Sequence, residues 1–188
     1  MRMTTCPNES LWFRRHRIRL SSVPAETRDW LLDPRSLTGR LQAVCAGRFH
    51  VEVVAQRWSH PQTWESRELG VRPGRNSLVR QVYLCCDHKA WVFARTVIPA
   101  ATLSGRERRL GNLKERPLGG VLFASPTLKR VGLTIERLVP GDALYAAAAR
   151  GAGIAPPVIW GRRSLFRING KVLMVSEYFL PGIPQCKR

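Results

Sequence analysis

The sequence predicts an α+β fold in which helices pack on a single antiparallel β-sheet. Residues 78–99 hold two strand-like apolar runs joined by Asp87-His88-Lys89, a short hairpin connection. The runs SLFRI and VLMVSEYFL flank Asn169-Gly170, a dipeptide that favours a tight hairpin turn. Helical segments separate these hairpins instead of alternating with single strands. We therefore expect an antiparallel sheet with its helices on one side.

The first third of the chain predicts two short helices and a strand. Residues 24–32 begin with a proline suited to a first helical turn, and Asp33-Pro34 ends the helix. Ser36 can cap a second helix that runs to about Gly47. Residues 50–58 predict a strand, and the proline- and glycine-rich residues 59–76 predict a long loop.

The middle of the chain predicts helices between further strands. Ser104 and Glu107 form an S-x-x-E capping box, which predicts a helix over residues 105–115. Pro117 begins a short turn or helix. Residues 127–138 predict another strand, and the alanine-rich residues 140–153 predict a helix that ends at glycine.

Length and composition suit one globular domain over residues 1–188, with residues 1–20 as a poorly ordered extension. We find no apolar run long enough to span a membrane and no secretory signal, so we expect a cytoplasmic protein. The five cysteines include no C-x-x-C pair, and the four histidines are scattered. This pattern predicts reduced thiols and no metal site.

The net charge of +18 is unusual for a chain of 188 residues. It fits nucleic acid, an anionic membrane surface or a small anionic substrate. The basic residues are mostly arginines spread along the chain, and composition alone leaves all three partners open.

Three charged residues lie on predicted strands among apolar neighbours. Alternation places Arg80 with Leu78, Val82 and Leu84, and gives Arg95 and Glu177 similarly apolar faces. A buried charge is costly unless it is paired. One interpretation is a structural ion pair between Glu177 and either arginine. The other is a pocket in which two arginines bind the carboxylates of a small dianion.

Two further motifs are weaker. Gly119-Gly120 could present backbone N–H groups to an anion, although a simple turn explains it better. Residues 160–163, Trp-Gly-Arg-Arg, could contact a phosphate, but a solvated turn is the better interpretation.

Several blocks, taken in order, resemble the chorismate pyruvate-lyase family. The resemblance covers about residues 24–184. Its departures are Leu37, where the family often has methionine, and a longer segment at 138–157. The blocks are DWLLDPRSLTGRL at 29–41, RQVYLC at 80–85, ARTVIPAATLSG at 94–105, PLGGVLFASPTLKR at 117–130, WGRRS at 160–164 and SEYFLP at 176–181.

The resemblance implies a monomeric enzyme, without metal or cofactor, whose helical flaps close over an internal site. Its reaction converts chorismate into 4-hydroxybenzoate and pyruvate for ubiquinone biosynthesis. By position, the product-binding residues would be Leu37, Arg80, Leu118 and Glu177.

We expect Arg80 to hold the ring carboxylate of chorismate and Glu177 to accept a hydrogen bond from the ring hydroxyl. We expect Arg95 to lie near the enolpyruvyl carboxylate, so the expected catalytic residues are Arg80, Glu177 and Arg95.

Two other functions also fit parts of the sequence, a carboxylate-binding module without activity and a nucleic-acid binder. A non-catalytic carboxylate-binding module, like the effector domains of GntR-type repressors, would follow a DNA-binding domain, and only about two dozen residues precede the match. A nucleic-acid binder would interleave aromatic residues with a basic patch, whereas Trp91 and Phe93 fall in an apolar strand. We therefore expect no nucleic acid partner, and we keep weak contact with anionic membranes as one use of the charge.

Overall fold

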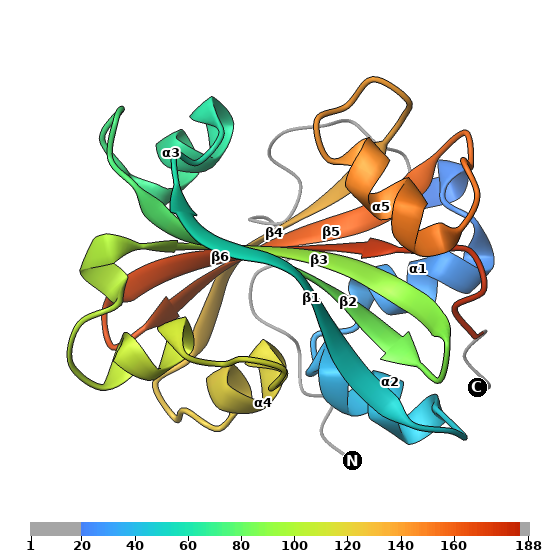
Figure 1. Cartoon of the computed structure of the whole chain (residues 1–188), viewed down its shortest axis with the longest axis horizontal. Helices are drawn as coiled ribbons and strands as arrows, with labels where there is room; N and C mark the ends of the chain where they lie inside the picture. The colour runs from blue at the N-terminus through green and yellow to red at the C-terminus, as the bar shows by residue number, and fades with distance from the viewer. Residues whose placement is uncertain (1–19, 185–188) are drawn as a thin grey trace, which may run out of the picture.

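A computed structural model describes residues 20–184, which form one six-stranded antiparallel sheet of strand order β1-β2-β3-β6-β5-β4 (Figure 1). The strands are β1 (Phe49–Ser59), β2 (Ser77–Cys86), β3 (Lys89–Pro99), β4 (Lys129–Leu138), β5 (Ile159–Ile168) and β6 (Lys171–Phe179). The α-helices are α1 (Ala25–Leu32), α2 (Leu37–Val44), α3 (Thr63–Leu69), α4 (Leu118–Phe123) and α5 (Tyr145–Ala152). Three 3₁₀ helices are η2 (Leu20–Ser22), η3 (Ala100–Thr102) and η4 (Gly105–Gly111).

The two predicted hairpins are confirmed, and they form the centre of the sheet. The β5–β6 turn has positive φ at Asn169 (48°) and Gly170 (78°), which matches the backbone that Asn-Gly favours in two-residue hairpin turns. In the β2–β3 turn Asp87 also has positive φ (50°). Strand β3 pairs with β6 and so joins the two hairpins into one sheet.

A β-bulge in the first hairpin decides which side chains share a face. Cys85 pairs with Ala90, but Leu84 pairs with Val92, so Trp91 is one extra residue on β3. Beyond the bulge the register is shifted by one, and Arg80 lies opposite Thr96 instead of Arg95. Because a shift of one residue exchanges the two faces of a strand, Arg80 and Arg95 point to opposite faces of the sheet.

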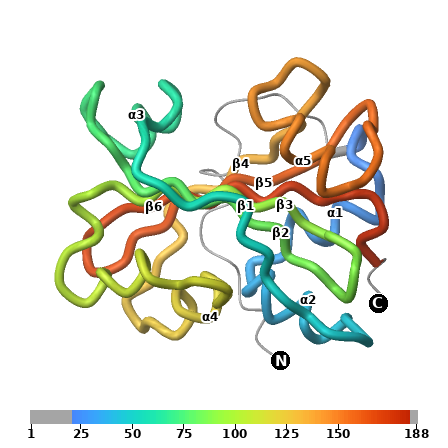
Figure 2. The backbone as a smooth tube through the Cα atoms, viewed as in Figure 1, coloured from blue at the N-terminus to red at the C-terminus, as the bar shows by residue number. Residues whose placement is uncertain are grey.

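Helices cover both faces of the sheet, which corrects the prediction that they lie on one side. Figure 1 shows α3 and α5 above the sheet and α1, α2 and α4 below it, and the tube in Figure 2 shows the same two layers. Both faces of the central strands are therefore covered, in agreement with the mostly buried residues of β2, β3 and β6.

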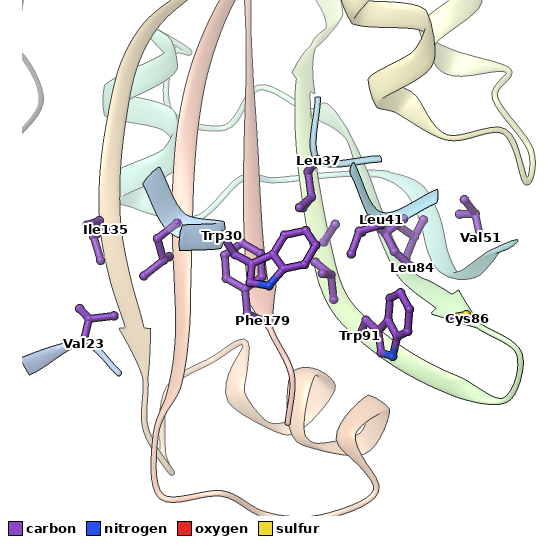
Figure 3. Packing of buried hydrophobic residues seen from close by; sticks show 14 residues of the cluster. Val23, Trp30, Leu37, Leu41, Val51, Leu84, Cys86, Trp91, Ile135 and Phe179 are labelled. Carbon is purple, nitrogen blue, oxygen red and sulfur yellow. The ribbon is translucent and has the colours of Figure 1, made fainter. Parts of the chain in front are cut away.

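The core below the sheet is built around Trp30, whose ring is fully buried. It packs against Phe179 of β6, and Leu37 and Leu41 of α2 belong to the same cluster (Figure 3). The Trp30 indole N–H donates to the carbonyl oxygen of Pro184 at 3.0 Å, and the Arg40 guanidinium lies 4.1 Å from the ring centre. These contacts fix α1 and α2 on the sheet.

The core above the sheet has two parts. Tyr145 and Ala148 of α5 pack with Phe93 and Tyr178, and Leu69 of α3 packs in a second cluster whose sheet residues are Val79, Val97 and Met174. Both helices therefore lie on the face that Arg95 shares.

Helix α3 lies within residues 59–76, where a loop was predicted. The Glu65 carboxylate accepts the Gln62 backbone N–H at 2.8 Å, which satisfies a free donor at the start of the helix. The predicted capping box at Ser104 is wrong, because Ser104 makes no cap and Glu107 instead binds Lys171 and Asn169. The predicted helix over 105–115 is accordingly the shorter 3₁₀ helix η4.

Other predictions need smaller changes. Residues 160–163 belong to β5 and not to a solvated turn, since Arg162 and Arg163 are buried. A disulfide joins Cys45 to Cys86, where reduced thiols were expected, while Cys85 is a free buried thiol.

The predicted extension at residues 1–20 lies almost wholly outside the described residues. Among residues 20–184, no helix is long and apolar enough to cross a membrane.

Candidate active site

A pocket lies between the lower face of the sheet and the first turns of α2 and α4. Its floor comes from β2, β3, β5 and β6, and its sides come from β1, β4 and the two helices. The lining is mostly apolar, with six side chains that carry charge or a hydroxyl: Thr38, Arg80, Thr96, Arg130, Arg162 and Glu177.

The starts of α2 and α4 lie against each other at the pocket. Leu37 and Leu118 are the first residues of the two helices, where a backbone N–H has no partner within the helix. A Cβ atom added to Gly119 would lie only 2.8 Å from Thr38 Oγ1. Gly119 therefore permits this close approach, whereas Gly120 has no such neighbour, and both glycines lie in α4 and not in the simple turn that was favoured.

Asp33 organises the corner that leads into α2. Its carboxylate accepts hydrogen bonds from the Arg35 side chain at 2.8–3.2 Å and from Arg40 Nη1 at 2.8 Å. The hydrogen bonds from Arg35 are the main reason that the pKa of Asp33 falls to about 2. This ion-pair cluster holds the α1–α2 corner, so Leu37 is placed at the pocket.

Arg80 lies on the floor of the pocket and is 2% exposed. Its guanidinium donates to Gln56 Oε1 at 2.8 Å and to the Lys114 carbonyl oxygen at 2.6 Å. Both acceptors are neutral, and no carboxylate of residues 20–184 forms an ion pair with it. Burial lowers the pKa of Arg80, as expected for a charge taken out of water without a counter-charge.

Glu177 faces the same pocket from β6 and pairs with Arg162 of β5. Arg162 Nε donates to Glu177 Oε2 at 2.6 Å. Arg162 Nη1 donates to the carbonyl oxygens of Trp30 at 3.0 Å and Asp33 at 2.6 Å. Arg162 therefore ties the end of α1 to the sheet and fixes the carboxylate of Glu177 at the pocket.

Arg95 does not face the pocket. Its Nε and Nη2 atoms donate to the two carboxylate oxygens of Glu65 in α3, at 2.7 and 2.8 Å, on the upper face of the sheet. The expectation that Arg95 lies near the substrate is wrong in position, because the bulge at Trp91 turns it to the other face. The alternative interpretation of an ion pair between Glu177 and Arg80 or Arg95 does not hold either, since Glu177 pairs with Arg162.

Arg163 belongs to a second charged cluster on the upper face. It forms ion pairs with Glu68 and Glu136, and its guanidinium lies 4.3 Å from the centre of the Trp64 ring. Tyr178 donates to Glu136 at 3.0 Å, and burial raises the pKa of that phenol. These contacts join α3 to β4 and β5, so this cluster serves the fold.

Comparison with known proteins agrees with this geometry. The sequence model of the family described as "Chorismate lyase" matches residues 6–186. The chain belongs to the chorismate lyase family.

Named relatives match over nearly their whole lengths. A protein of Methylococcus capsulatus named "Probable chorismate pyruvate-lyase" is 45% identical over 155 residues, which covers 82% of this chain and 94% of the relative. A protein of the same name from Aromatoleum aromaticum is 41% identical over 179 residues, covering 94% and 95% of the two chains.

Solved structures show the fold at much lower identity. The effector domain of PhnF from Mycobacterium smegmatis superposes with a TM-score of 0.57 at 19% identity, covering 80% of this chain and 91% of that domain. A GntR-family ligand-binding domain from Bordetella bronchiseptica gives 0.54 at 14% identity, covering 76% and 91%. The antiparallel α+β fold of this chorismate lyase family member is thus shared with such domains.

The structure brings together four of the five predicted site residues, Leu37, Arg80, Leu118 and Glu177, and places Arg95 elsewhere. Sequence reasoning missed Arg162 and Arg130. Both stand in blocks that resemble the family, but Arg162 was assigned to a turn and Arg130 was given no role. Within residues 20–184, no group of three or more His, Cys, Asp or Glu side chains is arranged to hold a metal ion.

Proposed function

We propose that the chain is a chorismate pyruvate-lyase that cleaves chorismate into 4-hydroxybenzoate and pyruvate and so feeds ubiquinone biosynthesis. The observation that carries this proposal is Arg80, a buried guanidinium whose partners within residues 20–184 are all neutral and which shares its pocket with Glu177. A buried charge without a counter-charge is costly, and a carboxylate of the substrate supplies that counter-charge.

Arg80 binds the ring carboxylate, which the product retains. Its two hydrogen bonds to Gln56 and Lys114 use one N–H of each terminal nitrogen, so three of its five N–H groups stay available. Gln56 also donates to the Gly111 carbonyl oxygen at 2.7 Å, which fixes its amide. The guanidinium is therefore held in place for a carboxylate before the ligand arrives.

Glu177 accepts a hydrogen bond from the ring hydroxyl. One of its oxygens, Oε2, is occupied by Arg162, and no residue of the described chain donates to Oε1. Leu37 and Leu118 close the site at the starts of their helices, with apolar side chains and first-turn N–H groups beside the ligand.

The reaction breaks the ether bond between ring carbon C3 and the enolpyruvyl oxygen, and the C–H bond at C4. The hydrogen ends on the methylene carbon of the leaving group, which becomes the methyl group of pyruvate, and the ring becomes aromatic. Because aromatisation drives the step, the chain mainly orients the substrate, excludes water and stabilises the separating charge.

Calorimetric titration of 4-hydroxybenzoate tests this assignment. The variant Arg80→Ala leaves the bound carboxylate without its partner, which costs about 2–5 kcal/mol of binding free energy. We therefore expect the product to bind at least tens of times more weakly. Arg167→Ala removes an exposed arginine of β5 and serves as the charge control. Unchanged product affinity in Arg80→Ala would show that the carboxylate binds elsewhere.

The resemblance supports three further proposals: one domain, a monomer and a cytoplasmic location. Weak contact with anionic membranes is a fourth, supported by the charge of +18. Sedimentation of the purified chain tests the monomer, and absence of co-sedimentation with anionic vesicles at low salt would remove the membrane contact.

A further inference from the structure

Arg130 is a third arginine of the pocket, and no carboxylate of residues 20–184 forms an ion pair with it. It stands on β4 opposite Phe166 of β5, and its guanidinium lies 5.2 Å from the centre of the Phe166 ring. Its Nε atom is buried and has no hydrogen-bond partner in the described chain. Arg162, by contrast, has a carboxylate and backbone carbonyl partners.

The surroundings of Arg130 are electrostatically unfavourable to its charge. Burial is the main cause that lowers its pKa to about 10, and the positive charge of Arg162 adds to this effect, while Glu177 and Asp33 oppose it. Arg130 nevertheless remains charged near neutral pH. Three guanidinium groups and one carboxylate line the pocket, which leaves two positive charges for a ligand.

We propose that Arg130 binds the enolpyruvyl carboxylate of chorismate. This inference rests on the proposed function, and it gives Arg130 the part that the sequence assigned to Arg95. Chorismate carries two carboxylates, which match the two unmatched guanidinium groups, Arg80 and Arg130.

The order of groups around the ring supports this arrangement. The ether arm leaves from C3, next to the C4 carbon that bears the hydroxyl. With the hydroxyl on Glu177 and the ring carboxylate on Arg80, the arm begins beside Glu177, whose charge acts on Arg130. Arg130 and Phe166 line the same pocket as Glu177, so we expect the arm carboxylate to meet the Arg130 guanidinium.

Removal of Arg130 should affect the binding of substrate and of product differently. The product lacks the enolpyruvyl carboxylate, so Arg130 contributes to chorismate binding and not to 4-hydroxybenzoate binding. Arg80, which holds the retained carboxylate, contributes to both. Arg130 is half-buried and forms no ion pair with a carboxylate of residues 20–184, so its removal should not lower thermal stability.

The test compares Arg130→Met and Arg130→Lys with Arg167→Met, which removes an exposed arginine of β5. Calorimetry measures 4-hydroxybenzoate and a stable dianion, 3-(carboxymethoxy)-4-hydroxybenzoate, and turnover of chorismate gives kcat/KM. For Arg130→Met we expect 4-hydroxybenzoate affinity within about twofold of wild type. We expect losses of about 30-fold or more in dianion affinity and in kcat/KM, because the arm carboxylate loses its guanidinium partner in the complex. Arg130→Lys should recover part of both.

Three results would overturn the inference. One is an equal loss of both ligands in Arg130→Met, which would indicate a general packing defect. Another is dianion affinity equal to wild type, which would place the arm elsewhere. A third is failure of Arg130→Lys to fold, which would make Arg130 a structural residue. If wild type neither binds 4-hydroxybenzoate nor consumes chorismate, the proposed function itself fails; these other results, with wild-type turnover intact, remove Arg130 alone.

Discussion

Replacement of Arg95 by methionine tests the placement of the two strand arginines. Arg95 and Glu65 are both buried, and two hydrogen bonds of 2.7 and 2.8 Å join them. Removal of one partner of a buried pair costs about 3–5 kcal/mol because the other charge stays buried and unpaired. For a chain of this size each kcal/mol lowers the melting temperature by about 2–4 °C, so we expect a decrease of about 6–20 °C.

Thermal unfolding followed by circular dichroism measures this decrease, and calorimetry at low temperature measures product binding. Since Arg95 lies on the face away from the pocket, we expect the affinity for 4-hydroxybenzoate to stay within about threefold of wild type. In the double variant Arg95→Met with Glu65→Leu both charges are removed, which is often close to neutral. Because Glu65 also accepts the Gln62 backbone N–H at the start of α3, we expect part of the lost stability to return and about 1 kcal/mol of it to stay lost with this cap.

Arg80→Met is the matched variant for the opposite face, and it should lose affinity while keeping its melting temperature. The opposite outcome would be an Arg95→Met variant that unfolds at the wild-type temperature but binds the product tens of times more weakly. Such a result would place Arg95 in the pocket and would contradict the register set by the bulge at Trp91.

Two further predictions concern carboxylates at the site. The pKa of Asp33 is about 2, below its ordinary value of 3.8, so its contribution to stability is complete above about pH 4 and is lost as the pH falls toward 2. The stability difference between wild type and Asp33→Asn, measured by urea unfolding, should therefore shrink between pH 6 and about pH 2.5; a constant difference would contradict this origin. In Glu177→Gln the Arg162 guanidinium loses its carboxylate and the ring hydroxyl loses a charged acceptor, so product affinity should fall about tenfold or more. Calorimetry checks this, and unchanged affinity would exclude a contact between Glu177 and the ligand.

The hairpins could be predicted from the sequence because their signals are local. Asn169-Gly170 needs only its own backbone conformation to specify a turn. Alternation along β2 and β6 likewise placed Arg80 and Glu177 on apolar faces, and the structure puts both on the pocket. A pattern within one strand is enough for such predictions.

The position of Arg95 could not be predicted in this way. Counting back from the turn without a bulge would pair Arg80 with Arg95, and the single extra residue Trp91 changes this register. A bulge depends on packing between strands, and here Trp91 joins the core below the sheet. The sequence pattern within β3 carries no sign of it.

Helix α3 and the start of β5 were missed for a different reason. The capping residues of α3 are Gln62 and Glu65, which an S/T-x-x-E pattern does not detect, whereas Ser104 and Glu107 satisfy the pattern without forming a cap. In β5 the pair Arg162-Arg163 suggested solvent exposure. Each guanidinium instead has carboxylate partners on its own side of the sheet, which only the tertiary structure supplies.

Consumption of chorismate by the purified chain, in buffer that contains EDTA, tests the proposed function most directly. Chromatography identifies the aromatic product, and a coupled dehydrogenase assay measures pyruvate. We predict equal amounts of 4-hydroxybenzoate and pyruvate, at a rate that EDTA does not change. Intact chorismate in the presence of protein shown to be folded by circular dichroism would contradict a lyase and would favour a ligand-binding module of the same fold.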